Sequence, residues 1–187
     1  NNCYLCKRQM WVENVAIMND IIIKESRLVE AAEKGMDAFV DVFFDAINSA
    51  VGGELSVGHL QQLNADQITL LAYRYMRDEV MDGGFVQLIH NGYGGFIFMN
   101  PFNKAVRAWG MQDLHRIISK CHRLYAKYGK EIEKDCSDDE FMALFERFPE
   151  FDTFDDEFVE KEEAFTAAVA HYIDEHIENF AKIEKDE

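Results

Sequence analysis

Proline and glycine are scarce in this sequence, and no long apolar run occurs in it. Two prolines and eleven glycines among 187 residues exclude collagen-like, linker-like and turn-dense all-β compositions. The longest apolar stretches, around 21–23 and 39–47, are interrupted by Asp and Lys well before the roughly 20 residues that a membrane span requires. We therefore expect neither a transmembrane helix nor a membrane partner.

Cysteine is also rare, and four residues are too few for a disulfide framework. Cys3 and Cys6 form one Cys-x-x-Cys pair, which could supply half a zinc site or a redox couple. The remaining thiols, Cys121 and Cys136, lie far along the chain and 15 residues apart, so two further zinc ligands are missing. We expect no metal, no cofactor and a reducing, cytoplasmic location. Because the chain begins with Asn1 and not with Met, a removed leader stays an open alternative.

Basic residues are outnumbered, with 19 Lys and Arg against 35 Asp and Glu, and the net charge is −16 at pH 7. Direct binding of nucleic acid depends on a basic surface that releases counterions from phosphates, so DNA and RNA are not the expected partners. Apolar residues make up 48% of the chain, which is enough for a core, and we expect it to fold despite its charge.

Apolar residues recur at helical spacing almost throughout the chain, and period-two alternation is not sustained. Asn64 with Gln67, and Ser137 with Glu140, have the spacing of helix-capping boxes. The pattern predicts helices over 36–50, from 65 onward, over 111–128, over 138–148 and over 153–180, with Thr153 as the last cap. We therefore predict a compact, multi-helix all-α domain over 36–187, preceded by a helical segment of unassigned role over 1–35.

Five of the eleven glycines collect between Asp82 and Pro101, which predicts a break between the central helices. We expect Gly83 and Gly84 to end one helix and an irregular loop to occupy 91–100. The glycine pattern does not match a phosphate-binding loop, because position 97 is not glycine and no Gly-Lys-Ser/Thr follows.

The acidic residues are concentrated at the C-terminal end of the chain. Residues 1–64 hold 9 acids and 5 bases, residues 65–130 hold 5 acids and 9 bases, and residues 131–187 hold 21 acids and 5 bases. The last segment therefore has a net charge of −16, equal to that of the whole chain. Such asymmetry produces a directional field that attracts basic partners.

Part of this acidic excess has a local explanation. Asp138, Asp139 and Glu140, and then 155–157, are expected in the first turns of helices, where the helix dipole favours carboxylates. Glu160, Glu162 and Glu163 gain no such benefit, and their mutual repulsion disfavours folding. We infer that the surplus acids serve something other than folding.

A stripe of basic residues accompanies these acids. Arg116, Lys120, Arg123, Lys127 and Lys130 recur by 4, 3, 4 and 3 residues, which places them on one helical face. This face could contact the acidic C-terminal helices, bind nucleic acid or remain solvated.

Residues 79–87, Glu-Val-Met-Asp-Gly-Gly-Phe-Val-Gln, followed by Asn91-Gly92, carry a family resemblance. They resemble the Glu-Val-Asn-Asn-Gly-Gly-Phe-x-Gln signature of a bacterial family of DNA-mimic proteins of about nineteen kilodaltons, from which Met81 departs. The resemblance covers about residues 63–180. It implies an all-helical protein that is able to dimerise and whose acidic side chains imitate DNA phosphates. The signature residues Glu79, Gly83, Gly84, Phe85, Gln87 and Asn91 are then elements of the fold.

Our leading hypothesis from the sequence is a non-enzymatic acidic module that competes with DNA for a basic DNA-binding protein, either a transcription factor or a histone-like protein. Carboxylates one helical turn apart are about 6 Å apart, on the order of the spacing of successive phosphates on one strand. The acids expected to act as phosphate substitutes are Asp138, Asp139, Asp155, Asp156, Glu160, Glu162 and Glu163.

Two alternatives remain at this stage. One is a hydrolase-type enzyme with a cleft near Gly83–Gly95 that uses His90, with Asp82 or Glu79 as acid or base. The other is an interaction module whose charge only confers solubility.

Overall fold

The computed structural model describes residues 21–53 and 57–186 and is an all-α fold, as predicted. The Cys3 and Cys6 pair lies outside the described residues. The elements are β1 (Ile22–Lys24), α2 (Glu25–Lys34), α3 (Met36–Ala50), α4 (Val57–Leu60), α5 (Ala65–His90), α6 (Gly94–Phe98), α7 (Phe102–Ala108), α8 (Gln112–Ile132), α9 (Asp138–Arg147), α10 (Asp152–Glu175), α11 (Ile177–Phe180) and β2 (Lys182–Glu184).

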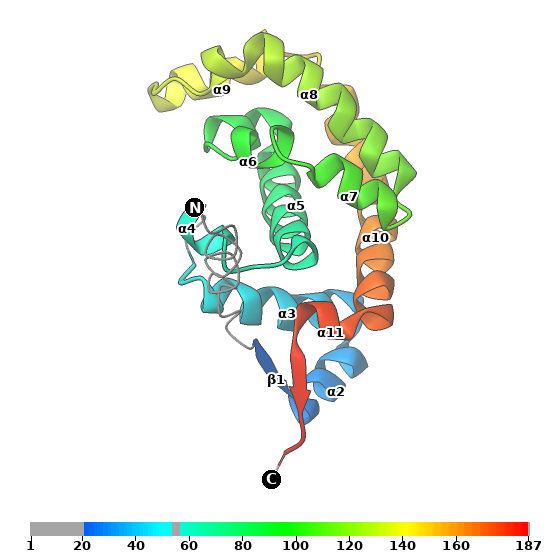
Figure 1. The fold of residues 1–187 in the computed structure, drawn as a ribbon. Helices are drawn as coiled ribbons and strands as arrows, with labels where there is room; N and C mark the ends of the chain where they lie inside the picture. The colour runs from blue at the N-terminus through cyan, green and yellow to red at the C-terminus, as the bar shows by residue number, and fades with distance from the viewer. Residues whose placement is uncertain (1–20, 54–56, 187) are drawn as a thin grey trace, which may run out of the picture.

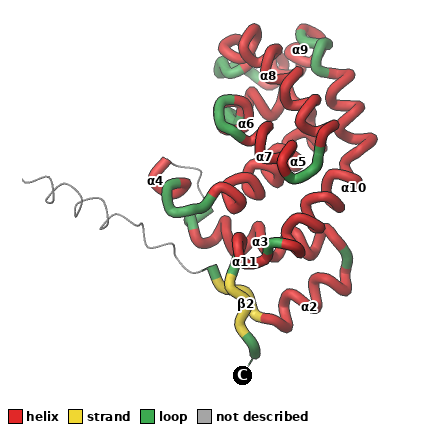
Figure 2. Tube along the Cα trace, turned by 45° about the vertical axis from the view of Figure 1, so that its right-hand side comes forward, coloured by secondary structure: helices red, strands yellow, loops and turns green. Residues whose placement is uncertain are grey.

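Helix α5 runs through the middle of the molecule, and the long helices α8 and α10 lie together along one side of it (Figure 1). Helix α3 crosses one end of α5 and also contacts α10. In the second view, α10 extends from α9 at one end of the molecule to α11 and β2 at the other (Figure 2). Helix α10 therefore runs along the length of the fold and contacts α3, α5 and α8.

The core is built largely from aromatic side chains of distant helices. Phe43 of α3, Phe85 of α5, Phe158 of α10 and Phe180 of α11 are fully buried. Phe85 contacts Phe158 edge to face, and Phe43 contacts Phe180 in the same way. Because aromatic side chains bury large apolar areas, these contacts join the helices into one core.

Both predicted capping boxes are present, with Asn64 and Gln67 at the start of α5 and Ser137 and Glu140 at the start of α9. The predicted break at Gly83 and Gly84 is also present, as a kink with non-helical backbone angles inside α5. The loop expected over 91–100 instead contains the short helix α6.

Other helix boundaries differ from the prediction. Helix α8 continues past Gly129 to Ile132. Gly129 is a packing position and not a helix end, because the ring of Tyr125 lies where a side chain at 129 would be. Helix α10 begins at Asp152, one residue before the expected cap Thr153, so Asp156 and Glu157 lie beyond its first turn.

The first described residues form a strand where a helical segment was expected. Strand β1 pairs in parallel with β2, with Ile22 opposite Lys182 and Lys24 opposite Glu184. This pairing brings the two ends of the described chain together, and α2 packs on α3. Among the described helices, none is long and apolar enough to cross a membrane.

Candidate protein-binding surface

The signature residues form a hydrogen-bonded clamp across the kink of α5. The side-chain amide of Gln87 donates to Asp82 Oδ2 at 2.7 Å and to Glu79 Oε2 at 3.2 Å. The amide of Asn91 donates to the same Glu79 oxygen at 2.8 Å. These bonds join the two halves of α5 on either side of the glycines, so the signature supports the fold.

Gly84 and Phe85 bind the kink to α10 through Asp155. The backbone N–H of Phe85 donates to Asp155 Oδ1 at 2.8 Å. Gly84 has φ +74°, and a Cβ atom there would lie 2.5 Å from Asp155 Oδ2. Asp155 is therefore an internal contact, which corrects the expectation that it is displayed on the surface.

Burial of Asp155 raises the pKa of its carboxyl group from 3.8 to about 7, although the Phe85 N–H opposes this and the neighbouring Asp152 and Asp156 add to it. Between about pH 4 and pH 7 the unfolded chain releases this proton while the folded chain retains it. The folded state then binds more protons, so the contribution of Asp155 to stability falls as the pH rises through this window.

We expect Asp155→Asn to remove this dependence. The free energy of unfolding of the wild type, minus that of the variant, is expected to fall by about 2–4 kcal/mol between pH 4.5 and pH 8. Urea unfolding of both proteins across this range measures the difference. Glu163→Gln, at an exposed position two turns further along α10, is the control and should change this difference much less. A constant difference for Asp155→Asn would contradict the prediction.

Glu162 is the second predicted surface acid that faces inward, with 7% of its surface exposed. It forms an ion pair with Arg77 of α5 and accepts a hydrogen bond from Thr166 Oγ1 at 2.7 Å. Burial alone would raise the pKa of Glu162, but the bonds from Arg77 and Thr166 outweigh it and hold the pKa below its ordinary value. Glu162 therefore forms an internal ion pair. This corrects the expectation that it acts as a phosphate substitute on the surface.

His90, the residue of the enzyme hypothesis, has structural contacts. Its Nδ1 lies 2.8 Å from the carbonyl oxygen of Ile132, and its ring packs on Phe141 with centroids 4.7 Å apart. Among the described residues, no hydrogen bond joins His90 to Glu79 or Asp82. The arrangement connects α5 to α8 and α9 and does not favour an acid–base pair.

Four exposed carboxylates line one face of α10, and we call them the α10 acidic stripe: Asp152, Asp156, Glu160 and Glu163. Their spacing of 4, 4 and 3 residues places them within about 80° of arc around the helix and over about 16 Å of its length. None of the four takes part in an ion pair with another described residue. Asp152 was not among the predicted binding residues, although the spacing in the sequence could have identified it.

Asp138 and Asp139 are exposed in the first turn of α9, as predicted from the capping box. They belong to a different helix and are not part of the α10 acidic stripe. Within the described residues, no three His, Cys, Asp or Glu side chains are grouped to hold a metal ion.

The basic stripe of α8 does not neutralise the α10 acidic stripe. Arg116 pairs with Glu157, whose Oε2 lies 3.0 Å from its Nη1, and Lys161 Nζ pairs with Asp113 Oδ2 at 2.6 Å. By helical periodicity, Glu157 and Lys161 lie roughly 100° or more around α10 from the middle of the acidic stripe. The α8–α10 ion pairs therefore involve a different side of the helix.

Lys127 of the same basic stripe lies over the ring of Tyr128, 4.4 Å from its centroid, and Lys120 and Lys130 are exposed. Of the three alternatives for this stripe, the contact with the C-terminal helices is present at Arg116.

The chain is similar to known proteins over most of its length. Residues 61–176 match the model of the family described as DMP19-like protein. The chain is also 37% identical over 125 residues to the protein named "DNA mimic protein DMP19" of Neisseria meningitidis serogroup B (strain ATCC BAA-335 / MC58). That match covers 66% of this chain and 76% of the relative. The matched region includes the signature clamp, Asp155 and the α10 acidic stripe.

Proposed function

The chain belongs to the DMP19-like protein family, and from this we propose that it is a DNA mimic that competes with DNA for a basic DNA-binding protein. The relative from Neisseria meningitidis bears the name of a DNA mimic. The partner would be a transcription factor or a histone-like protein, whose Lys and Arg side chains bind carboxylates in place of phosphates. Such a protein acts where bacterial DNA is bound, in the cytoplasm.

The α10 acidic stripe is the observation that carries this proposal. Its four carboxylates are exposed, lie on one face and have no cationic partner among the described residues. The helix beneath them is held by Glu162 to Arg77 and by Asp155 to the α5 kink. A rigid array of like charges resembles a nucleic-acid strand in the property that basic proteins detect first, which is its electrostatic field.

We expect removal of the stripe charges to abolish partner binding. The test variant is Asp152→Asn, Asp156→Asn, Glu160→Gln and Glu163→Gln combined. The immobilised chain is incubated with a bacterial lysate at low salt, and bound proteins are eluted with duplex DNA and identified by mass spectrometry. DNA-binding proteins should elute with DNA from the wild type, and their recovery should fall at least tenfold with the variant, because each lost phosphate-like contact weakens electrostatic binding.

A control with the same change in net charge keeps the test specific. It replaces four exposed acids outside the stripe: Glu25, Glu33, Glu175 and Glu178, each by Gln. This control should retain the proteins that the wild type captures. If duplex DNA releases nothing, or if the two variants behave alike, the chain is not a mimic that works through this stripe.

A further inference from the structure

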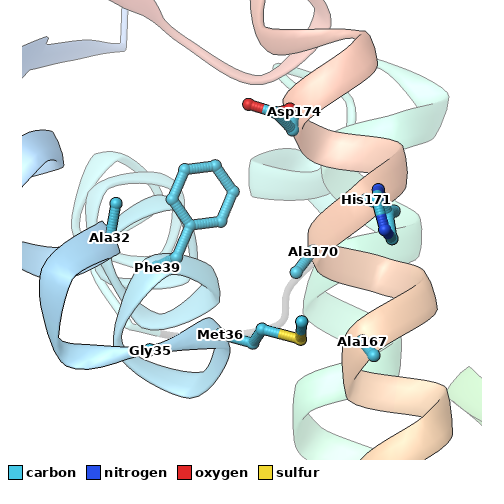
Figure 3. Close-up of a pocket in the computed structure, with 8 residues that line it drawn as sticks. All are labelled: Ala32, Gly35, Met36, Phe39, Ala167, Ala170, His171 and Asp174. Atoms are coloured by element: carbon cyan, nitrogen blue, oxygen red, sulfur yellow. The ribbon is translucent and has the colours of Figure 1, made fainter.

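A groove of about 370 Å³ separates the α2–α3 corner from the C-terminal half of α10. Met36 and Phe39 line one side of it, and Ala167 and Ala170 line the other (Figure 3). Met36 is 52% exposed, which is high for a large apolar side chain. Figure 3 shows the carboxylate of Asp174 at one end of the groove, while the ring of His171 turns away from it. The walls are apolar and the end is acidic.

The groove is continuous with the α10 acidic stripe. At 3.6 residues per turn, Ala167, Ala170 and Asp174 fall on the same face of α10 as Asp156 and Glu163. Ala170 lies seven residues beyond Glu163, which is about 10 Å along the helix axis. A partner that lies along the stripe therefore reaches the groove without changing direction.

The charge density of the stripe is lower than that of DNA. The stripe presents one carboxylate per about 5 Å of helix axis, whereas one strand of duplex DNA presents a phosphate per about 3.4 Å. A partner that reads charge alone would then prefer DNA. A competitive mimic needs an additional contact that DNA does not offer, and an apolar groove beside the charges provides one.

We propose that this groove receives one apolar side chain of the basic partner, on a segment whose Lys and Arg residues contact the α10 acidic stripe. This inference rests on the proposed function and specifies the partner. The partner segment carries cations about 10–27 Å from the apolar side chain, which are the axial distances from Ala170 to Glu163 and to Asp152. Asp174 at the end of the groove binds a further cation next to that side chain. Charge draws the partner to the surface, and the apolar contact then distinguishes this protein from DNA.

Two synthetic helical peptides test the groove directly. The first carries four lysines spaced by four, four and three residues and one leucine seven residues after the last lysine, and the second has serine in place of leucine. Fluorescence anisotropy measures Kd for both at several salt concentrations. The leucine peptide should bind wild type about tenfold more tightly than the serine peptide, because burial of one leucine is sufficient for such a difference. The difference should persist at high salt.

Two variants test whether the preference for leucine arises in the groove. Met36→Ser and, independently, the groove-filling Ala167→Gln should reduce the leucine-to-serine preference to less than about twofold. Met142→Ser is the matched control, because Met142 is an exposed methionine on α9, and it should retain the preference. Circular dichroism of each variant shows that the helical fold is kept.

The outcomes separate this inference from the proposed function. If both peptides bind equally well and their binding depends on salt, the proposed role of the groove is wrong, and the proposal that the protein mimics DNA is retained. Binding of neither peptide would overturn both. The leucine peptide could instead bind more tightly than the serine peptide, with the same affinity for the wild type and for the stripe variant. That result would support the role of the groove and contradict DNA mimicry through the stripe. If the wild type is a dimer that Met36→Ser converts to a monomer, a second copy covers the groove and the inference is wrong.

Discussion

Replacement of Gly84 by alanine is expected to lower the free energy of unfolding by about 3–5 kcal/mol. Gly84 has φ +74° and ψ −175°, a region that is occupied almost only by glycine. The added Cβ atom would also lie 2.5 Å from Asp155 Oδ2, so the carboxyl group must leave its hydrogen bond with the Phe85 N–H. Backbone strain and a lost buried hydrogen bond therefore act together.

Gly92 provides the control for this prediction. It also has a positive φ, +86°, but a Cβ atom there would meet nothing within 4 Å. Gly92→Ala should therefore cost only the backbone strain, about 1 kcal/mol. Urea unfolding monitored by circular dichroism compares the two variants. Equal losses would show that the contact between the kink and α10 contributes little.

Replacement of Glu162 by alanine is expected to destabilise the protein by about 3 kcal/mol, because it leaves the partly buried Arg77 without its main partner. Thr166, which donates to Glu162 and is hydrogen-bonded to the buried Tyr73, would lose its acceptor as well. Among the described residues, Arg77 would keep its exposed contact with Asp37, at 2.7 Å, as its one ion pair. Glu162→Gln keeps an acceptor for Thr166 and should cost less than Glu162→Ala.

The neighbouring residue Glu163 is the matched control, since it lies on the exposed side of the same turn of α10. Glu163→Ala should change the free energy of unfolding by less than about 0.5 kcal/mol. The same urea titrations measure both substitutions. A loss of less than about 1 kcal/mol for Glu162→Ala would show that the ion pair is not a stabilising contact.

The stability and binding predictions concern different acids of the same helix. Asp155 and Glu162 hold α10 in place, and the α10 acidic stripe is available to a partner. Loss of binding in the stripe variant should therefore occur without loss of stability. The two effects can be measured independently.

Much of the fold follows from local patterns. The capping boxes at Asn64 and Ser137 and the kink at Gly83 and Gly84 were predicted correctly, because each depends on residues within one or two turns. The inward position of Asp155 and Glu162 was missed. A signal for Glu162 was present, since it shares a helical face with Phe158, Phe165 and Val169, all of which are buried.

The amino-acid sequence alone specifies the helices, their breaks and the excess of acids in the last 57 residues, because these are properties of short segments and of composition. Tertiary packing selects which of those acids a partner can reach. Contacts with Arg77 and with the Phe85 N–H, 85 and 70 residues away, hold two carboxylates inside. The same packing of α3 against α10 forms the apolar groove next to the four exposed carboxylates of the α10 acidic stripe. Such contacts join residues that are distant along the chain, so no local pattern encodes them.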